Sequence, residues 1–301
     1  MHPGVRVAAR SYRFLRRTLV VGCLLTAAAV PAAPPAAPQA VRPAAPTETA
    51  KAPPATVLRM LQMNLCNSGR AACYTGRARA RAAEVITAET PDVVTLNEIC
   101  ANDLTVLSRV FQTVHPGRTV VAAFQAAGDR PSGNDTRCRN GQRFGIGVLT
   151  HVPASATPRT VYAGTHPTQD PADPEERAWL CVDVDGVVLA CTTHLSASGG
   201  YRIALTQCDH LLDAVLPTIS RQAGHLPTVL GGDLNLRAGH NPDVRSCIPP
   251  GHQRLDDGRL QHITATPDIT LCCRTLVPMH EATDHPGLLA TLTIDHSRRP
   301  A

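Results

Sequence analysis

One short string ends an apolar run with a carboxylate and a carboxamide two residues apart. After Thr228-Val229-Leu230 the chain reads Gly231-Gly232-Asp233-Leu234-Asn235. Alternate residues of an extended chain share a face, so Asp233 and Asn235 are predicted to project together, with glycines allowing close approach of a ligand or of backbone. This pair suits the positioning of a phosphate oxygen and an attacking water. The same string is also typical of an ordinary turn.

Further polar residues end or border apolar runs in a similar way. They are Asn64, Glu98, His194 and the pair Asp284-His285. Each has an ordinary alternative, such as a turn asparagine, a helix-capping glutamate, a hydrogen-bonded histidine or a loop dipeptide. Strand ends in α/β folds are where ligand sites are assembled, so a common site explains all of them together. The set offers oxygen ligands for a hard metal ion and histidines for acid–base chemistry.

The elements that must hold these residues alternate between strand and helix patterns. Strands are predicted over residues 57–64, 92–99, 144–150, 178–184, 187–194, 228–236, 262–265 and 287–294, and helices over 77–90, 104–112 and 201–216. The first helix is expected to stop before Pro91 and the third at Pro217, because proline disfavours a helical conformation in the preceding residue. Residues 178–194 form a hairpin that turns at Asp185-Gly186. This mixture predicts one α/β (α+β) domain.

The beginning of the chain has the composition of an export signal. Five arginines and no acid precede or enter a short apolar stretch, which ends in small residues, so residues 1–32 are predicted to be a signal peptide. A twin-arginine signal at Arg16-Arg17 and a lipoprotein box at Cys23 are weaker alternatives. Residues 33–55 are rich in Pro and Ala and predict a linker, which leaves 56–298 as the folded domain of a secreted protein.

The net charge of +5 does not indicate nucleic-acid binding. It arises from 29 Lys and Arg against 24 Asp and Glu, and five of those arginines lie in the predicted signal peptide. Without them the chain has as many basic as acidic residues. A basic surface is therefore not available as an argument for a polyanionic partner.

Ten cysteines follow the predicted signal peptide, which favours disulfides in an oxidising compartment. A zinc cluster is the alternative, but no Cys-x-x-Cys pair occurs. The spacing does not determine the pairing. Cys66 with Cys73, and Cys181 with Cys191 across the predicted hairpin, are the first pairs to test.

Five strings in order resemble the endonuclease/exonuclease/phosphatase (deoxyribonuclease I-like) superfamily. They are Met63-Asn64, Asn97-Glu98, Thr193-His194-Leu195, Gly232-Asp233-Leu234-Asn235 and Asp284-His285, and the resemblance extends over residues 57–294. It implies a four-layer α/β/β/α sandwich and phosphoesterase chemistry that depends on a divalent metal, usually Mg²⁺, with Mn²⁺ or Ca²⁺ as alternatives.

The resemblance also implies roles for individual residues. Glu98 is expected to be the main metal ligand, with Asn64 and Asp284 nearby. Asp233 and Asn235 are expected to orient the water and the phosphate. His285 is the expected general base, with Asp233 as the competing candidate. The expected role of His194 is to stabilise developing charge or protonate the leaving oxygen.

Two positions depart from the family pattern. Asn97 stands where the family usually has Gln, and Gln261 stands where an Asp commonly orients a catalytic histidine. A Gln carbonyl can accept an imidazole N–H but does not stabilise an imidazolium by charge. Either activity is reduced, so that the domain could be a weakly catalytic toxin-like or binding module, or Asp256 or Asp257 takes the role.

One basic segment favours a phosphate-rich substrate. Residues 130–143 contain four arginines, Arg130, Arg137, Arg139 and Arg143, against a single acid. Arg143, and Arg177 further along, are expected to bind substrate together with Asn235, since arginine forks suit phosphates. A solvated loop is the alternative. We expect a monomeric enzyme that acts on nucleic acid or another phosphodiester, with a sphingomyelinase-like phospholipase or an inositol-phosphate phosphatase as the second hypothesis.

Overall fold

The computed structural model describes residues 55–155, 160–197 and 201–296. The predicted signal peptide and nearly all of the predicted linker lie outside these residues. No helix in the described residues is both long and apolar enough to cross a membrane.

Six strands form the first sheet, in the order β14-β15-β1-β2-β6-β3. Their bounds are β1 Thr56–Asn64, β2 Val93–Cys100, β3 Arg118–Ala126, β6 Phe144–Pro153, β14 Ile269–Val277 and β15 Gly287–Ile294. Only β1 and β2 run parallel, with Asn64 level with Asn97. The polar residues that follow these two strands therefore lie at one edge of the sheet.

A second sheet of six strands has the order β12-β13-β11-β10-β9-β7. It contains β7 Val161–Thr165, β9 Ala178–Val184, β10 Val188–His194, β11 Thr228–Asp233, β12 Gln253–Asp256 and β13 Gln261–Ala265. Here β10 and β11 are the parallel pair, with His194 level with Asp233. A small third sheet joins β4 Gly128–Asp129, β5 Asn134–Asp135 and β8 Glu175–Glu176.

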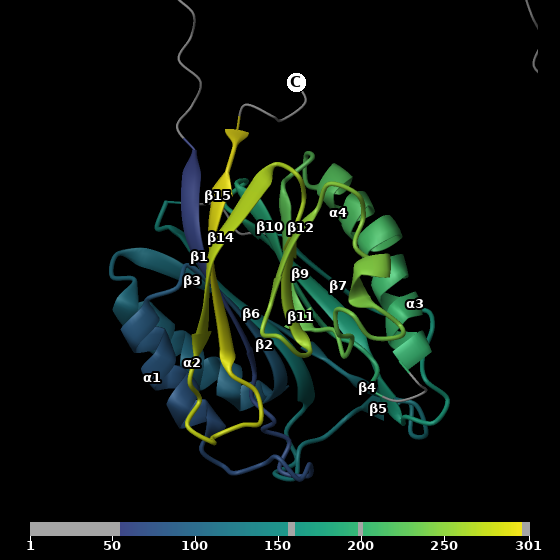
Figure 1. Ribbon diagram of the computed structural model, residues 1–301. Coiled ribbons are helices and arrows are strands. Elements are labelled where there is room, and N and C mark those ends of the chain that lie inside the picture. Colours follow the sequence, from purple (N-terminus) through teal and green to yellow (C-terminus); the bar gives the residue numbers. More distant parts are fainter. Residues whose placement is uncertain (1–54, 156–159, 198–200, 297–301) are drawn as a thin grey trace, which may run out of the picture. The chain divides into compact units, whose positions relative to one another are not determined.

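The two large sheets pack face to face and helices cover their outer faces (Figure 1). Between the sheets lies an aliphatic core that includes Met60, Val148, Leu180 and Val229. Helices α1 (Ala78–Glu89) and α2 (Ala101–Val114) cover the first sheet, and α3 (Arg202–His210), the π turn η2 (Leu211–Val215) and α4 (Leu216–Gln222) cover the second. A short 3₁₀ turn, η3, spans Val244–Ser246. The expected α/β/β/α sandwich is confirmed.

The glycines of the opening string serve the packing of the sheets. A Cβ on Gly231 would lie 2.5 Å from Thr95 Oγ1 and 2.6 Å from the Met60 side chain, both in the opposite sheet. A Cβ on Gly232 would lie 2.3 Å from the backbone oxygen of Thr193 on the neighbouring strand. Of the two expected reasons for these glycines, close approach of a ligand or of backbone, the structure shows close approach of other parts of the protein.

The prediction that the long helix ends at Pro217 is wrong. The helix continues to Gln222, because the π turn Leu211–Val215 precedes the proline. The Leu216 N–H bonds to the Leu211 carbonyl, five residues back, and Pro217 then sits in the first turn of α4. Proline lacks a backbone N–H, but in the first turn of a helix that N–H would have no partner within the helix, so the chain tolerates the proline there. The predicted set also lacks the strands β3, β7, β12 and β14 of the two large sheets and the short strands β4, β5 and β8.

Four disulfides join eight of the ten described cysteines. Both pairs proposed from the sequence, Cys66–Cys73 and Cys181–Cys191, are confirmed. The others are Cys100–Cys138 and Cys208–Cys247, which tie the end of β2 to the basic segment 130–143 and α3 to the residue after η3. Cys272 and Cys273 on β14 are exposed and free.

Candidate active site

The polar residues selected from the sequence meet at one edge of the sandwich. Asn64, His194 and Asp233 are the last residues of β1, β10 and β11, and Glu98 lies two residues before the end of β2. His285 precedes β15, which runs antiparallel to β1 and so begins at the edge where β1 ends. Because the carboxyl ends of parallel strands share an edge, local strand boundaries place these groups together.

Asn64 connects the two carboxylates of the site. Its Nδ2 donates to Glu98 Oε1 at 2.8 Å and to Asp233 Oδ2 at 3.0 Å, while its Oδ1 accepts the Cys66 N–H at 3.0 Å. The amide nitrogen, which has no lone pair for a metal, therefore faces the carboxylates. The structure thus places Asn64 as a support for Glu98 and Asp233, while its role as a metal ligand stays a prediction.

Asp233 and Asn235 adopt a turn, and the prediction of an extended pair is wrong. The strand ends at Asp233, Asn235 has a φ of 51°, and the Asn235 N–H donates to Asp233 Oδ1 at 3.0 Å. Asn235 Nδ2 donates to the Leu195 carbonyl at 2.8 Å. The two hypotheses for this string are thus compatible: it is a turn, and the turn lies in the site.

His285 faces Asp233. Its Nε2 lies 3.5 Å from Asp233 Oδ2 and 3.8 Å from Asp284 Oδ1. Its Nδ1 is buried and has no hydrogen-bond partner among the described residues. Asp284 is 56% exposed at the rim, where its nearest ionisable contact is His285. Within the described residues it belongs to no close group of metal-binding atoms with Glu98.

Glu98 is the carboxylate best placed for a metal ion. Burial raises its pKa, and the charge of Asp233 adds to the rise against the hydrogen bond from Asn64. Only Oε1 receives that bond, so Oε2 keeps its lone pairs for a cation. A buried carboxylate that is costly to ionise, with one oxygen left over, fits a hard divalent ion.

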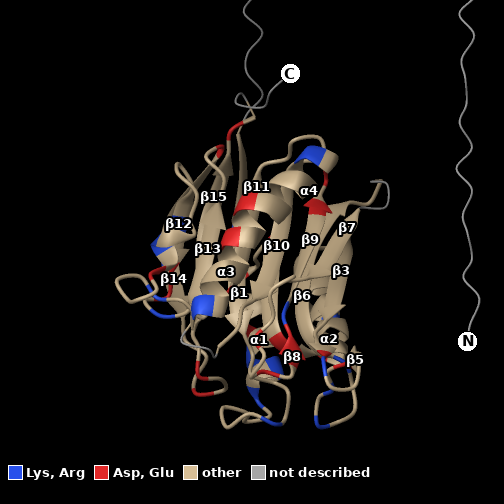
Figure 2. Cartoon of the chain, turned by 90° about the vertical axis from the view of Figure 1, so that its right-hand side faces the viewer, with Lys and Arg blue, Asp and Glu red and all other residues tan. Residues whose placement is uncertain are grey.

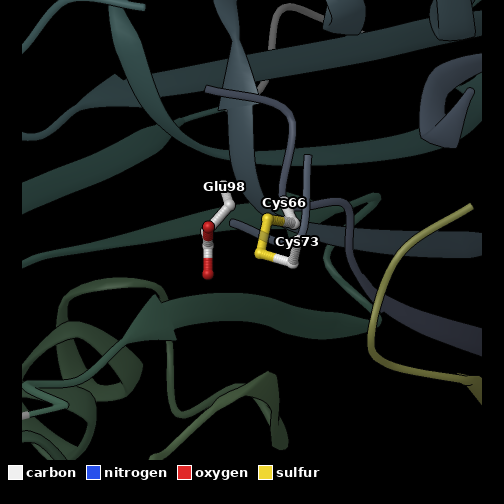
Figure 3. A group of neighbouring side chains, drawn as sticks. All are labelled: Cys66, Cys73 and Glu98. Carbon is white, nitrogen blue, oxygen red and sulfur yellow. A yellow bond between two sulfur atoms is a disulfide. The ribbon is translucent and has the colours of Figure 1, made fainter. Parts of the chain in front are cut away.

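The disulfide Cys66–Cys73 lies directly beside Glu98 (Figure 3). A sulfur of each cysteine and a carboxylate oxygen of Glu98 lie within 4.8 Å of one another. Since both sulfurs are in a disulfide, they offer no thiolate to a metal. The bridge instead closes the loop after Asn64, where Cys66 has a φ of 43°.

His194 is held by a buried arginine. Arg177 Nη1 lies 3.0 Å from His194 Nδ1, and a guanidinium can only donate, so the imidazole proton is on Nε2. That nitrogen lies 3.9 Å from Glu98 Oε1. Burial, together with the positive charge of Arg177, holds the pKa of His194 well below its ordinary value. His194 is therefore a neutral hydrogen-bond donor.

Arg177 is buried and paired with acids, so it is less available to a substrate than its predicted role in substrate binding requires. Its side chain is 6% exposed and pairs with Asp173 at 2.7 Å and Glu175 at 3.2 Å. Burial raises the pKa of Glu175 to about 7, with Asp173 and Glu98 adding to the rise and Arg177 opposing it.

Gln261 does not orient a histidine. Its Oε1 accepts the Asn64 N–H at 3.0 Å, and its Nε2 donates to the Pro286 carbonyl. It therefore joins the end of β1 to the residue after His285. Neither suggested substitute acid reaches His285: Asp256 pairs with Arg254, and Asp257 accepts backbone N–H groups. The carboxylate beside His285 is Asp233.

A layer of buried amides lies beneath the site, and the sequence drew attention only to its member Asn97. Asn97 Oδ1 accepts from Gln62 Nε2 at 2.7 Å and from the Asp233 N–H at 2.8 Å. Asn97 Nδ2 donates to the Thr193 carbonyl at 3.0 Å. Asn97, the mild departure from the family pattern, thus ties β2 to β10 and β11 across the two sheets.

A cavity of about 320 Å³ opens beside Glu98. Glu175, Arg70 and Arg137 are its other charged lining residues. Figure 2 shows acidic β8 among basic segments at this end of the sheets. Arg70 was not selected from the sequence, and its Nε donates to the Arg137 carbonyl at 3.0 Å.

The other arginines of the predicted basic loop lie outside that cavity. Arg143 is 53% exposed, stacks 5.5 Å from the Phe124 ring centroid and lies 4.0 Å from Asp135. Arg130 donates to the Asp173 and Pro171 carbonyls. Arg139 borders a separate cavity with Asp103. Successive residues of an extended chain face opposite sides, which is why Phe144 lines the cavity by Glu98 and the preceding Arg143 does not.

The four-layer sandwich and the acidic, histidine-containing edge define the chain as a phosphoester hydrolase by class. The family model described as Endonuclease/Exonuclease/phosphatase family matches residues 61–285, more than half of the chain. The chain belongs to this family. Enzymes of the family generally depend on a divalent metal, and the Glu98 site offers the oxygen donor that such an ion needs.

Solved structures share the fold at low sequence identity. An endonuclease/exonuclease/phosphatase from Beutenbergia cavernae is 21% identical, with a TM-score of 0.59 over 79% of this chain and 72% of that one. The human Nocturnin catalytic domain with bound sulfate is 16% identical, with a TM-score of 0.59 over 79% and 93%. A Bacteroides thetaiotaomicron mannosyl-6-phosphatase is 14% identical, with a TM-score of 0.56 over 78% and 99%. No curated protein sequence matches the chain.

Proposed function

We propose that this protein is a secreted, monomeric, Mg²⁺-dependent phosphodiesterase that cleaves nucleic acid. The observation that carries the proposal is the meeting of Glu98, His194, Asp233 and His285 at one edge, beside a cavity that also contains arginines. Carboxylates, histidines and guanidinium groups supply what phosphodiester hydrolysis needs: a metal site, proton transfer and neutralisation of phosphate charge.

Glu98 would hold the metal ion, with Asp284 at the rim as the second candidate ligand. A bound Mg²⁺ polarises a phosphoryl oxygen. The direct contacts of Asn64 with Glu98 and Asp233 hold the two carboxylates apart and in fixed orientations. Asn64 is therefore a positioning residue in this proposal.

His285 and Asp233 would accept the proton of the attacking water. A water at His285 Nε2 would lose its proton to that nitrogen, and the Asp233 carboxylate, 3.5 Å from the same nitrogen, would stabilise the resulting imidazolium. Asp233 thus supplies the negative charge that is missing at Gln261, the position where the family commonly has an Asp. This pairing makes His285 the base and Asp233 its partner, so the two candidates for the base act together.

His194 would donate a hydrogen bond to the developing negative charge. Its N–H is on Nε2, and its pKa lies well below the ordinary value, so the neutral form is the one present at neutral pH. Preorganised donors of this kind contribute about 2.7–4 kcal/mol to catalysis in other enzymes. Of the two predicted roles, stabilisation of charge fits the free protein better than protonation of the leaving oxygen.

Arg70 and Arg137 are the proposed contacts to substrate phosphates, since both line the cavity that contains Glu98. Two cations near one metal site suit a polymer that presents consecutive phosphates. Secretion is supported by the four disulfides, which persist in oxidising compartments, and by the signal-like composition of residues 1–32.

The test is cleavage of plasmid DNA and of single-stranded RNA by the purified mature protein with Mg²⁺. We expect EDTA to abolish cleavage, and His285→Ala to lower the rate by about 10²–10⁴-fold. His225→Asn is the matched control, because His225 is exposed on the loop before β11, at the opposite edge.

Equal cleavage by His285→Ala and by wild type would contradict the proposed base. EDTA-insensitive cleavage would contradict the metal requirement. Release of inorganic phosphate from a sugar or inositol phosphate, without cleavage of either nucleic acid, would replace the nuclease proposal with a phosphatase.

A further inference from the structure

A second polar cluster lies at the other end of β2. Asp92 immediately precedes the strand, His115 follows α2, and His151 belongs to β6. One ligand-capable atom from each of the three lies within 4.8 Å of the others. His151 is 11% exposed and Asp92 28% exposed, so the cluster is half-buried at a surface that a solute can reach.

The carboxylate of this cluster is fixed in place. Asp92 Oδ2 accepts the Arg59 N–H at 2.8 Å, which leaves Oδ1 directed at His151 Nε2, 3.1 Å away. Although burial opposes them, these two bonds hold the pKa of Asp92 below its ordinary value. Asp92 is therefore a carboxylate at neutral pH and needs no deprotonation before it binds a cation.

His115 has the hydrogen bond that metal-binding histidines usually make. Its Nε2 lies 2.8 Å from the Pro91 carbonyl, which can only accept, so the N–H is on Nε2 and Nδ1 keeps its lone pair. Burial lowers the pKa of His115. The ring packs 4.5 Å from Phe111 and 4.0 Å from His151, centroid to centroid, and this restricts its rotation.

We infer that Asp92, His115 and His151 form a binding site for a borderline divalent metal ion such as Zn²⁺. Two imidazoles and one carboxylate are a ligand set that suits such an ion, and three protein ligands leave a position for water. The site is separate from Glu98, which lies at the opposite end of the same strand, and does not depend on the proposed nuclease function.

Arg118 competes with the ion. Its Nε donates to His151 Nδ1 at 3.0 Å, so the proton of neutral His151 is on Nε2, where it faces Asp92. A metal at Nε2 displaces that proton, and a neutral ring then carries its N–H on Nδ1, opposite the Arg118 donor. Arg118 is the first residue of edge strand β3 and is partly exposed, so it can turn away. The charge of Arg118 thus weakens binding, and its removal must strengthen it.

The test is calorimetric titration of Zn²⁺ into the full mature protein carrying Cys272→Ser and Cys273→Ser, with saturating Mg²⁺. The serines remove the exposed adjacent thiols, and the Mg²⁺ occupies the Glu98 site, because both would otherwise bind zinc. We expect a single Zn²⁺ per chain and a zinc-dependent rise in Tm. His225→Asn should leave both unchanged.

Variants that change the Zn²⁺ affinity in opposite directions make the result specific. Asp92→Asn and His115→Gln should each weaken Zn²⁺ binding by about 100-fold. Loss of an outer hydrogen-bond partner costs a metal site about 10–100-fold, and loss of a direct ligand should reach the upper end of that range. Arg118→Gln keeps all three ligands, and its carbonyl can accept the Nδ1 proton, so binding should become about tenfold tighter.

Three results would overturn the inference. They are the absence of saturable zinc binding, an affinity that neither Asp92→Asn nor His115→Gln changes, and looser binding in Arg118→Gln. An anomalous-scattering peak between Asp92 and His151 in a zinc-soaked crystal would confirm the location, and a single peak elsewhere would refute it.

Discussion

The two ends of β2 hold the same arrangement of groups with different burial. At each end an arginine nitrogen lies 3.0 Å from a histidine Nδ1, and that histidine turns Nε2 toward a carboxylate. The groups are Arg177, His194 and Glu98 at the carboxyl end, and Arg118, His151 and Asp92 at the amino end. The histidine Nε2 lies 3.9 Å from the Glu98 carboxylate at the carboxyl end and 3.1 Å from the Asp92 carboxylate at the amino end.

Burial decides what each end can do. At the carboxyl end Arg177 is 6% exposed and held by two acids, so His194 keeps one tautomer and a lowered pKa. Burial also raises the pKa of Glu98. At the amino end Arg118 is partly exposed and Asp92 keeps a lowered pKa. A fixed arginine suits a catalytic site, and a movable arginine suits a site that exchanges its occupant.

The largest expected difference is in catalysis. Asp233→Asn should lower kcat/KM for bis-nitrophenyl phosphate by about 10²–10⁴-fold, because His285 loses the charge that supports its protonated form. Asp92→Asn should change it by less than about twofold, since it lies at the opposite end of the strand. Equal losses in both variants would show that the two ends are not functionally distinct.

Removal of the arginine should cost more unfolding free energy at the carboxyl end of β2 than at its amino end. Arg177→Met leaves Asp173 and Glu175 without their cation, and loss of one member of a buried ion pair costs about 3–5 kcal/mol of unfolding free energy. Arg118→Met should cost less than about 1 kcal/mol. Urea denaturation at a pH near 8, where Glu175 is ionised, measures both. A small loss in Arg177→Met would mean that Arg177 is not a structural cation.

Glu175, at the carboxyl end, should make stability depend on pH between about 4.5 and 7. The pKa of Glu175 is raised from 4.5 to about 7 in the folded protein, so its protonated form favours folding. That contribution is complete below pH 4.5 and is lost as the pH rises through about 7, a change of up to about 3 kcal/mol. Glu175→Gln should flatten this part of the stability curve, as urea denaturation at a series of pH values would show. A parallel curve in the variant would contradict the assignment.

The smallest expected effect concerns the disulfide beside Glu98. Loss of Cys66–Cys73, by the double substitution to serine, should cost about 2–3 kcal/mol of stability and raise the Mg²⁺ concentration needed for half-maximal activity. The matched control is Cys181→Ser with Cys191→Ser, which should lower stability without changing the Mg²⁺ requirement. An unchanged Mg²⁺ requirement in the first variant would show that the bridge does not shape the metal site.

The ends of strands were predictable because they are marked by local sequence. Asn64, Glu98, His194 and Asp233 each close an apolar run, and parallel pairing brings such closures to one edge. The missed strands carry weaker patterns: most of β14 is exposed, and β3 is rich in alanine. The π turn before Pro217 is also hard to predict, because it depends on packing of the helix against the second sheet.

The sequence by itself determined the family, the four-layer fold and the residues that gather at one edge of the sandwich, and it suggested two of the disulfide pairs. Only the tertiary structure decided their partners: Arg177 with acids, Asp233 with His285, Gln261 with backbone, and Arg70 beside the cavity. The physical reason is range. Strand boundaries follow from neighbouring residues, whereas the partner and pKa of a buried polar group depend on residues that are distant in the chain and on how completely they exclude water.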